Sequence, residues 1–210
     1  MNYTARISFN SNLWNSPSGI NGKAINSIAF ESIFGFGFEE WLFCERNQFK
    51  NIDGETWQYG YIQGIAENPE NLDTKKEIDL WALKFLRGKP LGERNPRFYV
   101  GTIKKWTLVD FTENKNIIET NPALINEMEK ELDEAVKGHS NYLNIIDEFK
   151  RTRRFEFDEE GSNLQMFNVK FLTSDFIFNR NQTPIDYSNP IYRFRNNSFH
   201  FYTTENIKFL

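Results

Sequence analysis

The sequence predicts an α+β fold in which a strongly curved mixed sheet, or a small β-barrel, is flanked by helices. Aromatic residues make up 16% of the chain, with 21 Phe, 8 Tyr and 5 Trp, and this abundance favours strands and ring-lined pockets. Three long strand-like segments follow one another, and two of them contain glycine, which is typical of a strand that bends. One helix has clear start and end signals.

The strands are predicted from runs of β-branched and aromatic residues that alternate with polar ones. A first strand is expected over Tyr3–Phe9. The three long segments are Trp57–Ile65, Ile78–Leu86 and Phe98–Phe111, of which the last has the clearest pattern. A final strand is expected around Ser198–Tyr202.

The helix that follows residue 120 is predicted from its boundaries. Asn121 is a suitable N-cap, Pro122 occupies the first helical position and Gly138 ends the helix. Apolar residues recur between them at helical spacing: Leu124, Ile125, Met128, Leu132, Ala135 and Val136. A second helix is expected over Tyr142–Lys150. We interpret these helices as an insertion around residues 120–150 of a single domain that spans residues 1–210.

Two segments near the N-terminus are less sharply defined. Residues 20–33 mix small and apolar side chains and are expected to be helical, with Ala24, Ile25, Ile28 and Ala29 on one side. The segment Phe38–Phe43 fits either a short helix or the start of a strand.

The composition limits the classes of function. With 39% hydrophobic and 26% charged residues the chain is expected to fold, and its net charge of −4 argues against nucleic-acid binding over the whole surface. A local basic patch remains compatible with that charge. A single cysteine, Cys44, excludes a disulfide framework and fits a reducing cytoplasm. There is no signal-like segment and no long apolar run, so we expect neither secretion nor a membrane partner.

The loop after the first strand is the strongest candidate for a binding site. It places one indole, Trp14, among the small polar residues Asn12, Asn15 and Ser16. An exposed indole beside such hydrogen-bonding groups suits a planar ligand with polar edges, such as a nucleobase. The alternative is that Trp14 fills the core and that the Asn and Ser residues only form the turn.

Basic residues cluster despite the acidic total, and such residues can hold backbone phosphates while rings hold bases. The alternative is that they lie on solvated faces and that neighbouring acidic residues such as Glu156 neutralise them. The candidates for phosphate binding are Lys104, Lys105, Arg151, Arg153, Arg154, Arg193 and Arg195.

Metal and nucleophile chemistry have little support. His139 and His200 are the only histidines, and neither has a Cys or His at zinc-binding spacing, so no cofactor is expected. Cys44 lacks the context of an activated nucleophile. A magnesium-dependent nuclease would use Glu77 and Asp79, which alternation places on one strand face, but Lys84 then falls on the other face.

Three segments resemble a known superfamily. The loop Asn12–Gly19 resembles the Asn-x-Trp-Ser-Ser-Thr loop of YTH domains, and Tyr59–Glu67 and Phe98–Ile103 resemble glycine-bearing strands of YTH and EVE domains, all in the PUA superfamily. This resemblance implies a small barrel with flanking helices. It also implies a cage of aromatic residues that holds a methylated base flipped out of a nucleic acid strand.

The resemblance carries over to few residues. Asn12 and Trp14 match the YTH loop, Ser16 keeps its second serine-like position, and Asn15 stands where the first serine would be. Trp41, Trp57, Trp81 and Trp106 compete for the next ring of the cage. The candidates for base binding are therefore Asn12, Trp14, Asn15, Ser16, Trp41, Trp57 and Tyr59.

In prokaryotes, domains of this kind are similar in role to specificity modules of modification-dependent restriction systems, and they stand at the N-terminus of longer chains. The resemblance therefore implies a non-enzymatic domain for methylated DNA in antiviral defence, with a nuclease or NTPase domain or subunit as partner. A magnesium-dependent nuclease, and a small-molecule or protein-interaction module with an aromatic pocket, are the alternatives.

Overall fold

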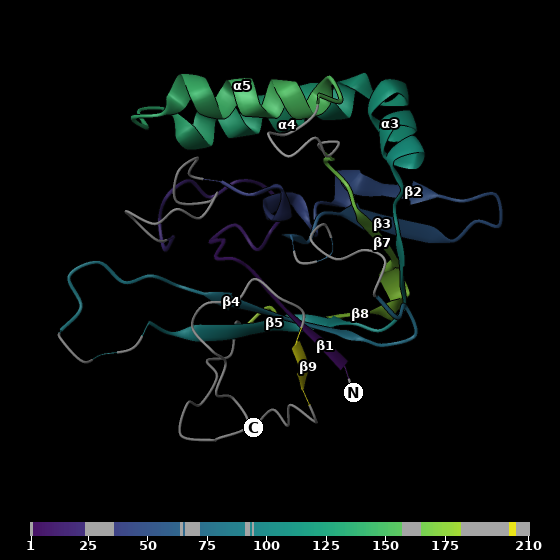
Figure 1. Ribbon diagram of the computed structural model, residues 1–210, viewed down its shortest axis with the longest axis horizontal. Coiled ribbons are helices and arrows are strands. Elements are labelled where there is room, and N and C mark those ends of the chain that lie inside the picture. The colour runs from purple at the N-terminus through teal and green to yellow at the C-terminus, as the bar shows by residue number, and fades with distance from the viewer. Residues whose placement is uncertain are drawn as a thin grey trace.

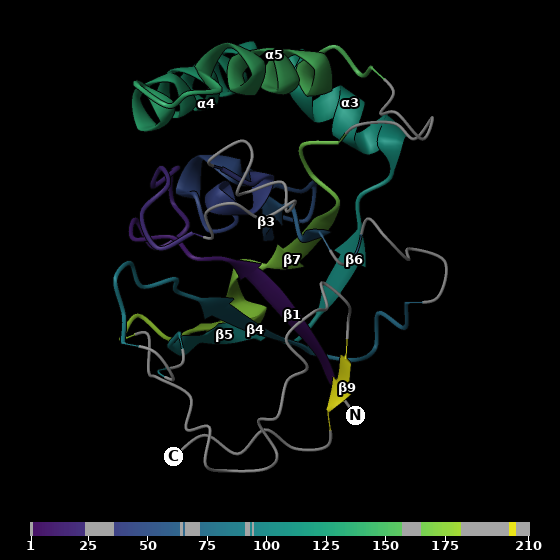
Figure 2. The same cartoon turned by 60° about the vertical axis from the view of Figure 1, so that its left-hand side comes forward.

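In the computed structural model the chain forms two β-sheets and a layer of helices (Figure 1). The structure describes residues 2–23, 36–63, 65, 72–90, 93, 95–156, 165–181 and 202–204. The helices lie over the four-stranded sheet, and the five-stranded sheet lies on the other side of it. Figure 2 shows the same three layers from a second direction.

The five-stranded sheet is mixed and has the order β8-β5-β4-β1-β9. β1 pairs in parallel with β4, whereas the other neighbours are antiparallel. Its strands are β1 (Asn2–Ser8), β4 (Ile78–Leu83), β5 (Arg97–Ile103), β8 (Phe176–Phe178) and β9 (Tyr202–Thr204).

The second sheet is antiparallel and has the order β2-β3-β7-β6. Its strands are β2 (Gln48–Lys50), β3 (Thr56–Gly60), β6 (Trp106–Leu108) and β7 (Val169–Leu172). The α+β class is thus confirmed, and one of the two sheets is mixed. The described strands form two open sheets, so the expectation of a closed barrel is wrong.

The helical layer consists of α3 (Phe111–Thr120), α4 (Pro122–Val136) and α5 (Tyr142–Arg153). The two predicted helices are confirmed, with Pro122 at the start of α4 and Gly138 just beyond its end at a φ of 83°. Asn121 does not cap α4 with its side chain. Its Nδ2 donates instead to the Ile117 carbonyl oxygen, 2.9 Å away, because the same residue also ends α3.

The long strand predicted over Phe98–Phe111 is two strands and the start of a helix. The exposed pair Lys104 and Lys105 separates β5 from β6. The Asp110 carboxylate then accepts a hydrogen bond from the Glu113 backbone N–H, 2.8 Å away, and this cap begins α3. Shorter pieces surround these elements: the 3₁₀ turns η1 (Phe38–Trp41), η2 (Glu45–Asn47) and η4 (Thr173–Asp175).

Two hydrophobic cores join the three layers. The first lies between the sheets and includes the buried side chains of Ile7, Leu80 and Val100 from the five-stranded sheet and Phe171 from the other. The second lies between the helices and the rest of the chain and includes Phe36, Trp41, Ile125, Leu132 and Phe149. The amphipathic faces of α4 and α5 are buried in this second core.

A β-bulge bends β5 where the sequence has glycine. Leu80 pairs with Gly101 but the next residue, Trp81, pairs with Tyr99, so Val100 is the extra residue. A Cβ at Gly101 would clash with the Ile177 carbonyl oxygen and lie 2.9 Å from the Phe176 ring. The glycine therefore allows β8 to approach the bent strand.

We expect Gly101→Ala to lower the free energy of unfolding by about 1–3 kcal/mol, because the added methyl group forces β8 away from β5. Urea denaturation followed by circular dichroism measures this change. Thr74→Ala, at an exposed turn, is the control and should stay within about 0.5 kcal/mol of the parent chain. An unchanged midpoint for Gly101→Ala would contradict this role for the glycine.

Candidate functional site

Trp14 does not offer a face to a ligand. Its side chain has 0% exposure, and its indole Nε1 donates to the Ser8 carbonyl oxygen at 2.9 Å. Its ring meets Phe43 edge-to-face, with 6.2 Å between the centroids. The prediction that Trp14 forms one wall of an open cage is therefore wrong. Trp14 fills the core between the sheets, as the alternative interpretation expected.

The backbone of the loop turns Trp14 inward. Leu13 and Trp14 have φ values of 56° and 58°, a conformation that few residues other than glycine adopt. The Asn10 side chain holds this turn, because its Oδ1 accepts hydrogen bonds from the backbone N–H groups of Asn12 at 2.6 Å and Trp14 at 3.2 Å. Asn10 thus replaces the backbone partners that the unusual conformation removes.

Two buried carboxylates in η1 hold the loop and the strand ends beside it. Glu40, with 0% exposure, accepts hydrogen bonds from Asn10 Nδ2 at 3.0 Å and from the Ser18 N–H at 2.7 Å, and it pairs with the Lys23 ammonium at 2.6 Å. The neighbouring Glu39 accepts from the N–H groups of Ser8 at 2.9 Å and Gln63 at 3.1 Å. Sequence reasoning missed both. Their signal was two acidic residues inside the apolar block FEEWLFC, since buried carboxylates need partners.

The polar residues of the loop mainly shape the turn. Asn12 Nδ2 donates to the Pro17 carbonyl oxygen at 2.8 Å, and Asn15 Nδ2 donates to the Asn12 carbonyl oxygen at 3.3 Å. Both side chains are exposed. Ser16 differs, because it lines a shallow cavity of about 450 Å³ between the loop and α4. The residues around this cavity are Ser16, Pro17, Lys130, Glu131, Glu134 and Ala135.

The cavity beside the loop lacks the properties of a base cage. Among the described residues no aromatic ring lines it, and the charged groups that they contribute are two carboxylates and one ammonium. Trp41, predicted to bind a base, is 1% exposed and lies behind it, where its Nε1 donates to the Glu131 carboxylate at 2.8 Å. Trp41 therefore positions a wall of the cavity and cannot stack on a ligand.

The remaining two predicted base-binding residues lie on β3 at a different surface. Trp57 and Tyr59 point to the same face of the four-stranded sheet and are both partly exposed. Strand register extends this face across the sheet, since Trp57 pairs with Phe49 and Leu172, and Tyr59 pairs with Lys170. Thr107 pairs with Lys170, and Lys105 lies two residues before it. We call this surface the outer face: Phe49, Trp57, Tyr59, Lys105, Thr107, Lys170 and Leu172.

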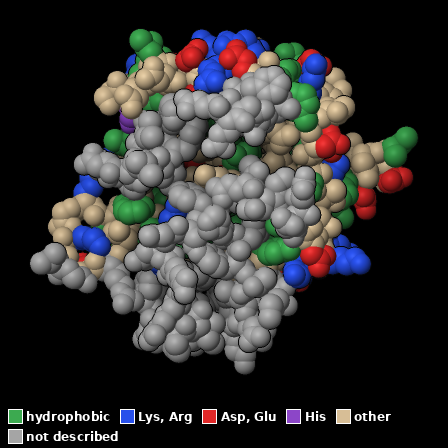
Figure 3. Space-filling view, viewed as in Figure 1, with side chains coloured by type: hydrophobic (Ala, Val, Ile, Leu, Met, Phe, Trp, Pro, Cys, Tyr) green, Lys and Arg blue, Asp and Glu red, His purple; other side chains and the backbone are tan. Residues whose placement is uncertain are grey.

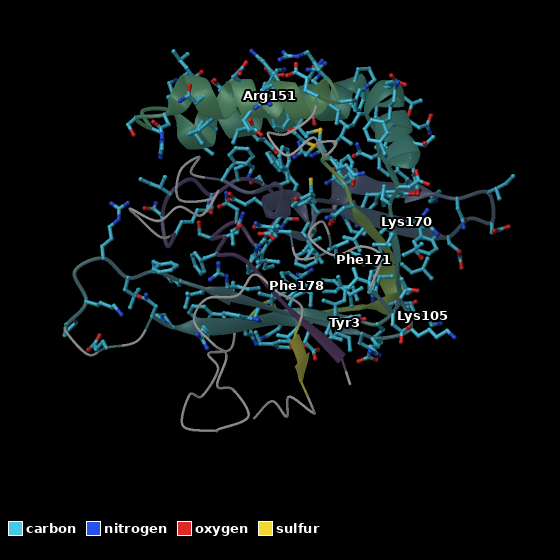
Figure 4. The ribbon with its side chains drawn as sticks, in the orientation of Figure 1. Tyr3, Lys105, Arg151, Lys170, Phe171 and Phe178 are labelled. Carbon is cyan, nitrogen blue, oxygen red and sulfur yellow. The ribbon has the colours of Figure 1, made fainter. Side chains whose placement is uncertain are left out.

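Lys170 brings positive charge to the rings of the outer face. Its Nζ lies 5.7 Å from the ring centroid of Trp57 and 5.7 Å from that of Tyr59, which is cation–π geometry. Figure 4 shows the side chains of Lys170 and Lys105 on the same side of the molecule. The outer face therefore combines half-exposed rings with two ammonium groups.

Glu113 of α3 anchors one end of the outer face. Its Oε1 accepts hydrogen bonds from Tyr59 Oη at 2.7 Å and from Lys170 Nζ at 2.6 Å. Burial of the phenol, together with the nearby negative charge of Glu113, raises the pKa of Tyr59 well above its ordinary value. Tyr59 thus stays neutral at physiological pH and is held in place, whereas Trp57 has no such restraint from α3.

The arginines predicted to bind phosphate are paired with carboxylates. Arg151 pairs with Glu148 and Glu156, Arg153 pairs with Glu129, and Arg154 pairs with Glu156. Figure 3 shows basic and acidic side chains interleaved along the helical layer. The expectation that acidic neighbours neutralise this run is borne out. Lys104 and Lys105 are exposed and form no ion pair within the part of the chain that the structure describes, while Arg193 and Arg195 lie outside it.

The described residues provide no metal site for a magnesium-dependent nuclease. Asp79 is buried and accepts a hydrogen bond from Thr102 Oγ1, and the Lys84 ammonium lies 5.0 Å from the centroid of the Phe9 ring. Among the described residues, no three His, Cys, Asp or Glu side chains come together in a way that could hold a metal ion. Cys44 is buried as a free thiol.

Comparison with known proteins adds no relative. No family model, no curated protein and no solved structure matches this chain. None of the helices in the described ranges combines the length and the apolar character needed to cross a membrane.

We expect Glu40→Gln to lower the free energy of unfolding by about 3–5 kcal/mol, because it removes the carboxylate charge that pairs with the buried Lys23 ammonium. Thermal or urea unfolding measures this loss. The double variant Glu40→Gln/Lys23→Met removes both charges and should recover part of the stability. Equal destabilisation by the single and double variants would contradict a role for the ion pair.

Proposed function

We propose that this chain is a nucleic-acid-binding domain that stacks one base on Trp57 at the outer face. The observation that carries the proposal is the exposure of Trp57. Of the five tryptophans, all of which the structure describes, the other four are 5% exposed or less, and Trp57 alone is partly open. Trp57 was one of the candidates for the next ring of the cage, and here it takes the place of Trp14.

The rings of the outer face are suited to bases in an exposed strand. Stacking of a base on an aromatic side chain contributes about 1–3 kcal/mol. Antiparallel sheets that display aromatic residues are a recurrent means of holding unstacked bases. Phe49 lies opposite Trp57, and its ring meets Tyr59 edge-to-face at 5.3 Å. Both of these rings pack against the second hydrophobic core, so they support the indole from the side of the helices.

Lys105 of the outer face is suited to a phosphate that accompanies the base. Lys105 is exposed without an ion pair in the described residues, whereas Lys170 is paired with Glu113 and holds its ammonium near the two rings. Because the arginines of α5 already have carboxylate partners, the proposal places the phosphate contacts at the sheet. A local contact of this kind is compatible with a net charge of −4.

The resemblance of Tyr59–Glu67 and Phe98–Ile103 to strands of YTH and EVE domains is the ground for proposing a methylated base, most simply in DNA, as the target. A methyl group buried against the rings adds about 0.8 kcal/mol, so the methyl group by itself gives modest discrimination. Recognition of the base edge must supply the rest. In this proposal a nuclease or NTPase domain or subunit would act on the DNA that the domain selects.

We expect Trp57→Ala to weaken binding of a methylated oligonucleotide by about tenfold or more, through the lost stacking. Fluorescence anisotropy with a panel of modified and unmodified strands measures the affinity, and circular dichroism checks the fold. Leu143→Ala is the matched control, because Leu143 is an apolar residue of α5 with 78% exposure. Binding by Trp57→Ala that equals that of the parent chain would overturn the proposal.

We also expect Lys105→Ala to reduce the slope of log affinity against log salt concentration by about 1, as one phosphate contact is lost. Titrations at several salt concentrations measure the slope. Lys89→Ala removes the same charge from the connection between β4 and β5, at the opposite end of the molecule (Figure 1), and should leave the slope unchanged. Identical slopes for the two variants would place the phosphate contacts elsewhere.

A further inference from the structure

The hairpin that joins β2 to β3 carries a fully exposed isoleucine at its tip. Ile52 has 101% relative exposure, so the side chain makes no packing contact with the described protein. The hairpin projects from the body of the molecule (Figure 1), and in Figure 3 it ends in hydrophobic and acidic side chains. An isoleucine in such a position contributes nothing to the core.

The tip is nevertheless firmly built. The Asn51 N–H donates to the Glu55 carbonyl oxygen at 2.9 Å, and the Gly54 N–H donates to the Asn51 carbonyl oxygen at 3.1 Å. The Asn51 side chain closes the turn, because its Oδ1 accepts from the Glu55 N–H at 2.9 Å and its Nδ2 donates to the Glu55 carboxylate at 2.9 Å. Gly54 takes a φ of 82°, which the turn requires. Ile52 is thus presented on a defined turn.

The same hairpin carries Trp57, the residue proposed to stack on a base. Phe49 pairs with Trp57, and Ile52 follows Phe49 by three residues, a separation of at most about 10 Å because the chain turns after Lys50. Ile52 and Trp57 are therefore held on one hairpin, with Ile52 at its tip.

We propose that Ile52 is an apolar wedge that enters the base stack of a duplex and fills the gap left by the base that Trp57 holds. This inference rests on the proposed function. Apolar side chains, isoleucine among them, are inserted between base steps by many DNA-binding proteins. Extrusion of a base costs free energy, and a side chain that fills the gap lowers that cost.

The charges at the tip add a second consequence. Asp53 is exposed, and no ion pair of Asp53 occurs within the described residues, whereas the Glu55 carboxylate is bound by Asn51. A wedge that enters DNA brings the Asp53 carboxylate near phosphates, which opposes binding. Asp53→Asn should therefore bind a duplex more tightly than the parent chain.

The test compares one target sequence as a single strand and as a duplex, with 2-aminopurine opposite the target base to report on stacking. Ile52→Ser should lose about tenfold in duplex affinity and most of the 2-aminopurine signal, and keep its single-strand affinity within about twofold. Ile52→Leu should retain both. Trp57→Ala should lose affinity for both forms, since the base stacks on Trp57 in both. Thermal unfolding checks that each variant is folded.

The outcomes separate the two proposals. If Ile52→Ser binds the duplex as the parent chain does while Trp57→Ala is weakened, the wedge is overturned and the proposed function stands. Equal weakening of single-strand and duplex binding by Ile52→Ser also overturns the wedge, because Ile52 is then a general contact. If the parent chain binds neither form, the proposed function fails and the wedge fails with it.

Discussion

The buried carboxylates of η1 are the constraint on which the N-terminal half of the structure depends. A carboxylate removed from water must be paired or hydrogen-bonded, and Glu39 and Glu40 find their partners at the end of β1, along the loop and just after β3. These bonds draw the loop over η1 and leave Trp14 inside the core. The loop that resembles a base-binding loop in sequence therefore has a structural role, which is to place Trp14 in the core.

Sequence signals predicted those helices whose boundaries are set by residues within or next to the helix itself. Pro122 and the helical spacing of apolar residues gave α4 nearly to its observed ends. α3 was missed, because the apolar run before Asp110 continues the strand pattern and only the cap marks the change. The sequence left two interpretations of Trp14 open, a cage wall or a core residue, because the choice depends on carboxylates 25 residues and more away in the chain. The sequence did name Trp57 among several candidate rings. The alternation of residues in β3 indicates which face of the sheet Trp57 occupies, but it does not indicate whether other elements cover that face.

The helical layer explains why the candidate binding surface is restricted to one end of the outer face. α3 supplies Glu113, which holds Tyr59 and Lys170 and covers that end of the outer face. α5 pairs its arginines with carboxylates of α4 and of its own C-terminal turn, and these partners compete with a phosphate for the arginines. The half-exposed indole of Trp57 and the exposed ammonium of Lys105 remain at the other end. In this interpretation the packing of the helices, more than the total charge, decides where a polyanion can bind.

The most direct measurement follows the indole N–H signals of the five tryptophans by ¹H–¹⁵N NMR while a methylated oligonucleotide is added. Single Trp→Phe variants assign the signals. Stacking at the outer face predicts that the Trp57 signal shifts and that the signals of the buried Trp14 and Trp41 move little. A large shift of Trp14 or Trp41 with an unchanged Trp57 would contradict the account and return the site to the loop.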